Sequence, residues 1–131
     1  MNKITLALTI SVLSATSSIA QTSPWVYFRD AGGVEAFIDP SSRKTYGWGE
    51  KGITILWNFG EGTRNSRVPG ESQVETIIFE CNKSKMKFSS STWYELADAK
   101  GDIVEKERVN RKWYPIRYNY ILLFAKICVG G

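Results

Sequence analysis

Ile53-Thr54-Ile55-Leu56-Trp57-Asn58-Phe59 is the clearest alternating stretch in the chain. Successive side chains of a β-strand point to opposite faces of a sheet, so every second residue shares a face. Here the shared face carries four large apolar side chains, those of Ile53, Ile55, Trp57 and Phe59. The stretch therefore predicts a strand whose inner face lies on the hydrophobic core.

Two stretches before this strand predict an opening hairpin. Residues 25–29 are rich in aromatic and β-branched side chains, and Asp30-Ala31-Gly32-Gly33 has the composition of a turn. Residues 34–39 then place alternate apolar side chains on one face. Asp39-Pro40-Ser41-Ser42 predicts the end of this second strand, because proline has no N–H for the ladder and serine favours turns.

Three further strands are predicted after the alternating stretch. A loop rich in Gly, Arg, Asn, Ser and Pro over residues 60–71 leads to a strand over residues 74–81. Asn82-Lys83-Ser84 turns into a strand over residues 86–96, and Asp98-Ala99-Lys100-Gly101 leads to a strand over residues 103–109. The whole pattern predicts a meandering antiparallel sheet of about six strands.

The C-terminal segment, residues 118–127, has a helical rather than an alternating pattern. Its apolar residues recur at i, i+3, i+4, i+7 and i+10, namely Tyr118, Ile121, Leu122, Ala125 and Cys128. A strand is the alternative, since Ile, Phe and Tyr favour strands and the run is short. We expect a helix, because Cys128 then lies on the buried stripe and can bridge to the sheet. The predicted fold is therefore α+β.

The chain contains two cysteines, Cys81 and Cys128, and no histidine. A zinc site needs four ligands, and a cysteine nucleophile usually needs a histidine as its base. In an exported protein, two cysteines are most simply explained as one disulfide. We therefore expect the Cys81–Cys128 bridge to tie the helix to the sheet, and we expect no metal and no cofactor.

The first twenty residues are typical of a secretory signal peptide. Lys3 precedes an apolar run over residues 4–13, and Ser18-Ile19-Ala20 is a small–x–small cleavage site. The apolar run is too short to span a bilayer. A core helix is the alternative, but core helices seldom begin at Met1 with a lysine and end in Ala15-Thr16-Ser17-Ser18. Cleavage after Ala20 would leave one domain, residues 21–131, with no integral membrane segment and no nearby cysteine to carry a lipid. We expect this domain in the periplasm or the medium, with the cell surface also possible.

The formal net charge of +4 is a mild surplus, far from the dense basic stripe of a nucleic-acid-binding protein. Together with export, it argues against nucleic acid as a partner.

Several short motifs occur in a recognisable order along the chain. They are Trp25 in the opening strand, Ala36-Phe37-Ile38-Asp39-Pro40-Ser41-Ser42, Leu56-Trp57, Phe79-Glu80-Cys81, Trp113-Tyr114-Pro115-Ile116 and Cys128. This order resembles the surface-adhesin protein E-like domain of Gram-negative bacteria over nearly all of residues 21–131. The resemblance implies an antiparallel sheet with a disulfide-tied C-terminal helix. It also implies a cell-surface protein that binds host matrix or serum proteins and can bind haem as a dimer.

Two features depart from that family. Its founding adhesin is lipid-anchored, whereas the cleavage site here lacks a cysteine. Haem usually takes a histidine, cysteine, methionine or tyrosine ligand, and here there is no histidine and both cysteines are expected to be paired. Haem binding is therefore not carried over, while a homodimer stays possible.

Five basic residues, Arg64, Arg67, Lys83, Lys85 and Lys87, are the candidate partner-binding residues. The three lysines are spaced by two, so in an extended strand they project to one side, and the arginines lie in the loop before the Cys81 strand. The resemblance places ligand binding around that same strand. The hypothesis is a basic surface that attracts acidic segments of a protein partner. The alternative is an ordinary solvated edge that discourages aggregation.

Other candidate residues favour structural roles. An aromatic cleft for a sugar or peptide could be formed by Trp48, Trp57, Trp93 and Trp113, but core packing or a sheet-face contact is the favoured interpretation. Trp57 is expected in the core, while Trp93 shares a strand face with Lys87 and is expected to be exposed. Glu80 is expected to lie opposite the core, solvated or paired with a lysine.

Catalysis is not expected. Asp39 with Ser41 or Ser42 lacks a base, and Glu105 with Glu107 is explained as exposed hairpin charge. We therefore expect a non-enzymatic binding domain whose partner is a host matrix or serum protein or a bacterial envelope protein. The alternative function is a periplasmic inhibitor or accessory protein that acts on another bacterial protein.

Overall fold

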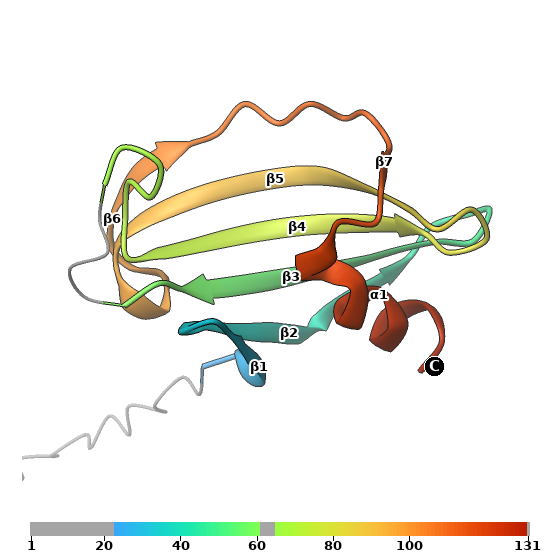
Figure 1. The fold of residues 1–131 in the computed structure, drawn as a ribbon, viewed down its shortest axis with the longest axis horizontal. Helices are drawn as coiled ribbons and strands as arrows, with labels where there is room; N and C mark the ends of the chain where they lie inside the picture. Colours follow the sequence, from blue (N-terminus) through green and yellow to red (C-terminus); the bar gives the residue numbers. More distant parts are fainter. Residues whose placement is uncertain (1–22, 61–64, 131) are drawn as a thin grey trace, which may run out of the picture.

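A computed structural model describes residues 23–60 and 65–130, and Figure 1 shows its arrangement. Six strands follow one another in the sheet in chain order, each antiparallel to the next. They are β1 (Val26–Ala31), β2 (Val34–Thr45), β3 (Glu50–Asn58), β4 (Ser72–Glu80), β5 (Lys85–Leu96) and β6 (Lys100–Lys106). The predicted meander is confirmed. The predicted signal peptide and Arg64 lie outside the described residues.

Shorter elements complete the fold. A 3-10 turn, η1 (Ala97–Ala99), joins β5 to β6, and a two-residue strand, β7 (Tyr114–Pro115), pairs with the start of β5. A second 3-10 turn, η2 (Tyr118–Tyr120), leads into the helix α1 (Ile121–Cys128), which lies against one face of the sheet (Figure 1). The helix expected at the C-terminus is therefore confirmed, and the alternative of a strand is not.

The second strand is longer than expected. Asp39-Pro40-Ser41-Ser42 does not end it, because β2 continues to Thr45 beyond a register shift between Asp39 and Lys44. Side chains replace the ladder at this irregularity: Ser42 Oγ accepts the backbone N–H of Thr54 at 2.8 Å. Asp39 Oδ1 accepts the N–H of Ser41 at 3.0 Å. Pro40 is tolerated here because the hydroxyl of Ser42 accepts the hydrogen bond from Thr54 that the displaced backbone of β2 does not accept.

The core lies between the sheet and α1. Ile53, Ile55 and Trp57 are buried there as predicted, and Phe59 packs against them while partly exposed. The neighbouring strands add Ile77, Phe79 and Met86, and the C-terminal segment adds Tyr120, Leu123 and Ile127. The predicted inner face of β3 is therefore confirmed.

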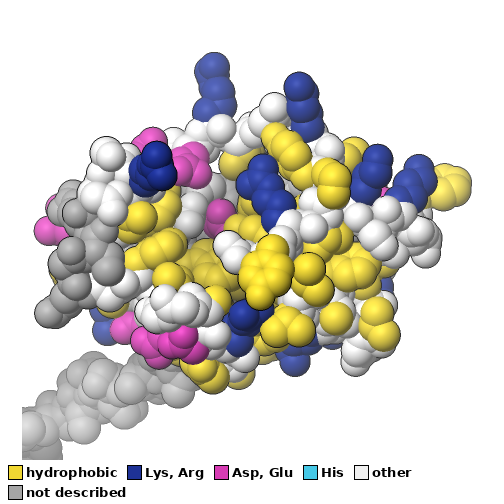
Figure 2. All heavy atoms as spheres, viewed as in Figure 1, with side chains coloured by type: hydrophobic (Ala, Val, Ile, Leu, Met, Phe, Trp, Pro, Cys, Tyr) yellow, Lys and Arg dark blue, Asp and Glu magenta, His cyan; other side chains and the backbone are white. Residues whose placement is uncertain are grey.

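The prediction of which side of α1 is buried is wrong, because the helix is rotated about its axis relative to the predicted orientation. Leu123 and Ile127 are buried, whereas Leu122 is 54 % exposed and Tyr118 is 83 % exposed. Nearly every residue of α1 is apolar, so periodicity alone cannot choose its inner side. Ring packing fixes the choice, because Phe124 packs edge-on against Phe79 with centroids 5.6 Å apart. The outer stripe leaves hydrophobic side chains on the surface over α1 (Figure 2).

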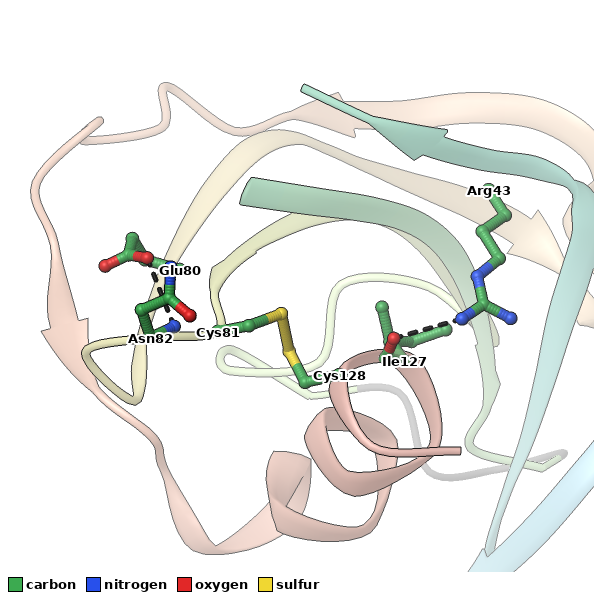
Figure 3. The surroundings of a disulfide bond; sticks show 6 residues. All are labelled: Arg43, Glu80, Cys81, Asn82, Ile127 and Cys128. Carbon is green, nitrogen blue, oxygen red and sulfur yellow. Dashed lines mark hydrogen bonds between the residues drawn. A yellow bond between two sulfur atoms is a disulfide. The ribbon is translucent and has the colours of Figure 1, made fainter. Parts of the chain in front are cut away.

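The predicted disulfide is confirmed. Cys81, directly after β4, is bonded to Cys128 at the end of α1, with 5.4 Å between their Cα atoms. Arg43 supports the same junction, because its Nη2 donates to the carbonyl oxygen of Ile127 at 3.0 Å (Figure 3). The bridge and this bond hold the end of the helix against the sheet.

The prediction that Trp93 is exposed is wrong. The β4–β5 register shifts between the pairs Ile77–Phe88 and Thr76–Ser90, so one extra residue is inserted in β5. Such a bulge reverses which alternate residues face inward. Trp93 therefore lies on the inner face, 4 % exposed, with its ring 5.1 Å from that of Phe59.

Candidate partner-binding site

Three segments meet at the end of the sheet where β4 turns into β5. They are the β2–β3 turn, the β4–β5 turn and the residue that precedes β7, and they enclose a pocket of about 390 Å³. We call it the tryptophan pocket; its lining residues are Trp48, Glu50, Glu80, Asn82, Lys83, Lys85 and Trp113. Lys and Arg side chains gather at this end of the molecule beside a hydrophobic side chain (right in Figure 2).

Trp48 stands out because it is a large ring that is 94 % exposed. Its backbone has a φ of 67°, a left-handed conformation that costs a non-glycine residue on the order of 1–3 kcal/mol. The turn is closed by a bond from Tyr46 N–H to Glu50 O at 2.8 Å and is tied to the next turn by Cys81 N–H to Gly49 O at 3.1 Å. The fold thus fixes a turn that holds an indole out in water.

Gly49 is required at this turn for two reasons. Its φ is 77°, and a Cβ atom at this position would collide with the side-chain amide of Asn82. The close approach of the two turns therefore depends on a residue without a side chain.

The structure brings together the three lysines predicted as binding residues, but not Arg67. Lys83 and Lys85 line the tryptophan pocket, and the Nζ of Lys87 lies 4.4 Å from the ring centroid of Trp113. Lys83 lies in the turn rather than the strand, so only Lys85 and Lys87 share a strand face. Arg67 lies in the loop before β4, at the opposite end of that strand from Lys83 (Figure 1).

Of the two states expected for Glu80, solvated or paired with a lysine, the first is wrong. Glu80 lies on the face of β4 away from α1, as expected, but it is only 8 % exposed. Its Oε1 accepts the N–H of Asn82 at 3.2 Å, and its Oε2 has no hydrogen-bond partner among the described residues. Figure 3 shows Glu80 and Asn82 on one side of Cys81 and the disulfide on the other.

The sequence suggests Trp48 and Trp113 as members of an aromatic cleft but favours packing for them, and it does not reveal the burial of Glu80. Trp48 sits among glycines with no periodic pattern, so nothing local marks it as a wall of a pocket. Glu80 is covered in part by the β2–β3 turn, which is distant from it in sequence. The Phe79-Glu80-Cys81 motif was the one available signal, and it pointed to the disulfide rather than to the carboxylate.

A second set of polar groups is buried on the α1 side of the sheet. Glu75 Oε2 accepts Nε1–H of Trp57 at 2.9 Å and the O–H of Tyr120 at 2.7 Å. Burial raises the pKa of Glu75 despite these two hydrogen bonds. Glu107 is itself exposed, but it accepts Nε1–H of the buried Trp93 and the hydroxyl of the buried Ser91, both at 2.9 Å. These carboxylates therefore serve as acceptors for core donors.

The carboxylates weighed as catalytic candidates are not arranged for catalysis. Glu105 is exposed on β6, whereas Glu107 is engaged with Trp93, so the two do not form a facing pair. Ser41 Oγ donates to Asp39 Oδ1 at 2.6 Å, as in a local turn. In residues 23–60 and 65–130, no group of three or more His, Cys, Asp or Glu residues is arranged to hold a metal ion.

The part of the chain that the structure describes contains no helix with the length and apolar content needed to cross a membrane.

Comparison with known proteins supplies the family. No curated protein matches the sequence. The sequence model of the family described as surface-adhesin protein E matches residues 25–128, which include every strand, the helix and both cysteines. The resemblance noted from the order of motifs is confirmed, and the chain belongs to the surface-adhesin protein E family.

Proposed function

We propose that residues 21–131 form an exported, non-enzymatic domain that binds a protein partner at the tryptophan pocket. Family membership indicates an adhesin-like protein that is exported or on the cell surface. The single observation that carries the proposed site is Trp48, 94 % exposed on a strained turn beside Lys83 and Lys85. Strained backbone clusters at functional sites, and tryptophan is enriched among the residues that dominate binding energy.

The charge around this pocket favours an acidic partner segment. Lys83 and Lys85 are exposed at its rim, and Lys87 lies against the second indole, Trp113. Exposed charges at the rim of an interface mainly steer the encounter and select the partner. The proposed basic surface therefore consists of Lys83, Lys85 and Lys87, and we call this end of the molecule the lysine end of the sheet. Arg67 lies at the other end of β4 and is not part of this surface.

The partner is a host matrix or serum protein, in keeping with the family, and the domain reaches it from the medium or the cell surface. Binding to a periplasmic protein in place of matrix proteins would instead support the alternative of an inhibitor or accessory protein.

The test is a binding panel of purified matrix proteins, serum proteins and periplasmic proteins, measured by surface plasmon resonance. The Lys83→Glu/Lys85→Glu variant is compared with Lys100→Glu/Lys106→Glu, an equal charge change on exposed β6. We expect the first variant to lose at least tenfold in affinity and the control less than twofold. Equal losses in both variants would reduce the site to a general effect of net charge and would contradict the proposal.

A further inference from the structure

The buried carboxylate of Glu80 lacks a donor. Its Oε2 is closed off from solvent and has no partner among the described residues, while the residue as a whole lines the tryptophan pocket. Leaving a buried polar atom unpaired costs its full desolvation penalty, and the penalty is larger for a charged group. Such atoms in native proteins call for an explanation, and an absent ligand is one. The missing group is a hydrogen-bond donor.

The charges across the strands indicate that this donor is a cation. Glu50 on β3 lies directly opposite Glu80 on β4, and Glu80 lies opposite Lys85 on β5. Like charges directly opposite each other destabilise a strand pair. All three residues line the pocket, and this cross-strand row holds two carboxylates and one ammonium. The other ammonium of the pocket, that of Lys83, lies outside the row in the exposed turn, so Glu80 has only Lys85 as a positive neighbour across the strands.

The walls of the pocket suit a flat cation. Trp48 and Trp113 both line it, and indole is the ring that attracts cations most strongly. The ammonium group of Lys87 already lies over the ring of Trp113. A guanidinium group can stack on an indole and still donate several N–H bonds in its plane, which an ammonium group cannot do.

We infer that the tryptophan pocket takes an arginine side chain from the partner's acidic segment. The guanidinium lies against Trp48 and donates to Glu80 Oε2, while acidic residues beside that arginine meet Lys83 and Lys85. Because Oε2 is covered in the unbound arrangement, one of the exposed side chains around it moves aside on binding. This inference rests on the proposed binding site and adds the side chain that the site selects.

The test uses two nine-residue peptides that differ only in the terminal group of one side chain. The first has an arginine between two pairs of glutamates, and the second has citrulline, which keeps the shape but not the charge. Affinities are measured by calorimetry at low salt for the wild-type protein and for Glu80→Gln, which preserves the acceptor for Asn82. We expect the wild type to bind the arginine peptide at least tenfold more tightly, and Glu80→Gln to bind both peptides equally.

Trp48→Ala keeps the test independent of any folding defect in Glu80→Gln, because the exposed indole makes little contribution to the core. We expect this variant to lose most of the preference for arginine as well. Equal binding of the two peptides by the wild type, or a preference that survives in Glu80→Gln, would overturn the inference.

The citrulline peptide keeps the two proposals distinguishable. If it binds and loses affinity in Lys83→Glu/Lys85→Glu, the lysine site stands whatever the arginine comparison gives. If the arginine peptide binds through Glu80 but neither peptide depends on the lysines, the arginine pocket stands and the acidic-segment proposal fails. Absence of binding by either peptide up to millimolar concentration contradicts both.

Discussion

Tyr120 donates its phenolic O–H to Oε2 of Glu75 across 2.7 Å, and this bond joins the segment before α1 to the middle of β4. The same oxygen accepts Nε1–H of Trp57 from β3 at 2.9 Å. One buried carboxyl therefore connects two strands and the C-terminal segment. Desolvation outweighs the two hydrogen bonds and raises the pKa of Glu75. Burial, followed by the nearby Glu75 carboxylate, raises the pKa of Tyr120.

The raised pKa of Glu75 predicts a pH-dependent stability. The folded state holds this proton more tightly than the unfolded state, so the contribution is full below the ordinary glutamate pKa of about 4.3 and is lost as the pH rises through the folded pKa. Glu75→Gln keeps an acceptor and removes the titration. Urea unfolding between pH 4 and 8 should show the wild type losing stability relative to Glu75→Gln, with a slope of at most about 1.4 kcal/mol per pH unit. If the difference in free energy of unfolding between the two proteins stays constant with pH, or changes in favour of the wild type as the pH rises, burial does not raise the pKa of Glu75.

Removing the hydroxyl of Tyr120 should destabilise the protein. In Tyr120→Phe, Glu75 loses a buried donor, which costs about 1–3 kcal/mol in free energy of unfolding. Tyr118→Phe is the matched control, since Tyr118 is exposed, and it should change stability by less than about 0.5 kcal/mol. Equal effects in denaturant melts would show that the Tyr120–Glu75 bond contributes nothing specific.

Adjacent leucines on α1 test which side of the helix is buried. Leu123→Ala should lower the free energy of unfolding by about 2–5 kcal/mol, because Leu123 lies in the core, whereas Leu122→Ala should cost under about 1 kcal/mol. Thermal or urea unfolding of the two variants gives the comparison directly. If Leu122→Ala were the more damaging change, the observed rotation of the helix would be wrong.

The disulfide should make a large contribution to stability. It links residues 47 apart in sequence, and the chain-entropy model gives about 4 kcal/mol for a loop of that size. Cys81→Ser/Cys128→Ser should therefore lose most of that amount, and the reduced wild type should match it in unfolding experiments. If the double variant and the reduced wild type each lose less than about 1 kcal/mol of free energy of unfolding, α1 packs as well without the disulfide.

The order of the strands, the core face of β3 and the disulfide could all be predicted from the sequence. They follow from alternation, turn composition and a pair of cysteines, which are local or countable features. The face of Trp93 could not, because one inserted residue in β5 reverses the alternation and nothing in the run of serines at residues 89–91 marks it. Periodicity likewise could not choose between two apolar sides of α1.

The candidate site was predictable only in part. Lys83, Lys85 and Lys87 are recognisable from their spacing, and the structure places them together. Arg67 belongs to the other end of β4, which a linear reading of the loop before that strand does not reveal. Trp48 and Glu80 meet because two turns distant in sequence are hydrogen-bonded through Cys81 and Gly49, a relation that exists only in the folded sheet.

The central claim is that partners bind at the lysine end of the sheet, around Trp48. Hydrogen–deuterium exchange of the protein, alone and saturated with the strongest binder from the protein panel, tests it most directly. We predict slowed exchange in residues 46–50, 81–87 and 112–114, and unchanged exchange in residues 65–71 and 100–106. Protection confined to the loop over residues 65–71, or to β6, with none in the Trp48 turn, would contradict the claim.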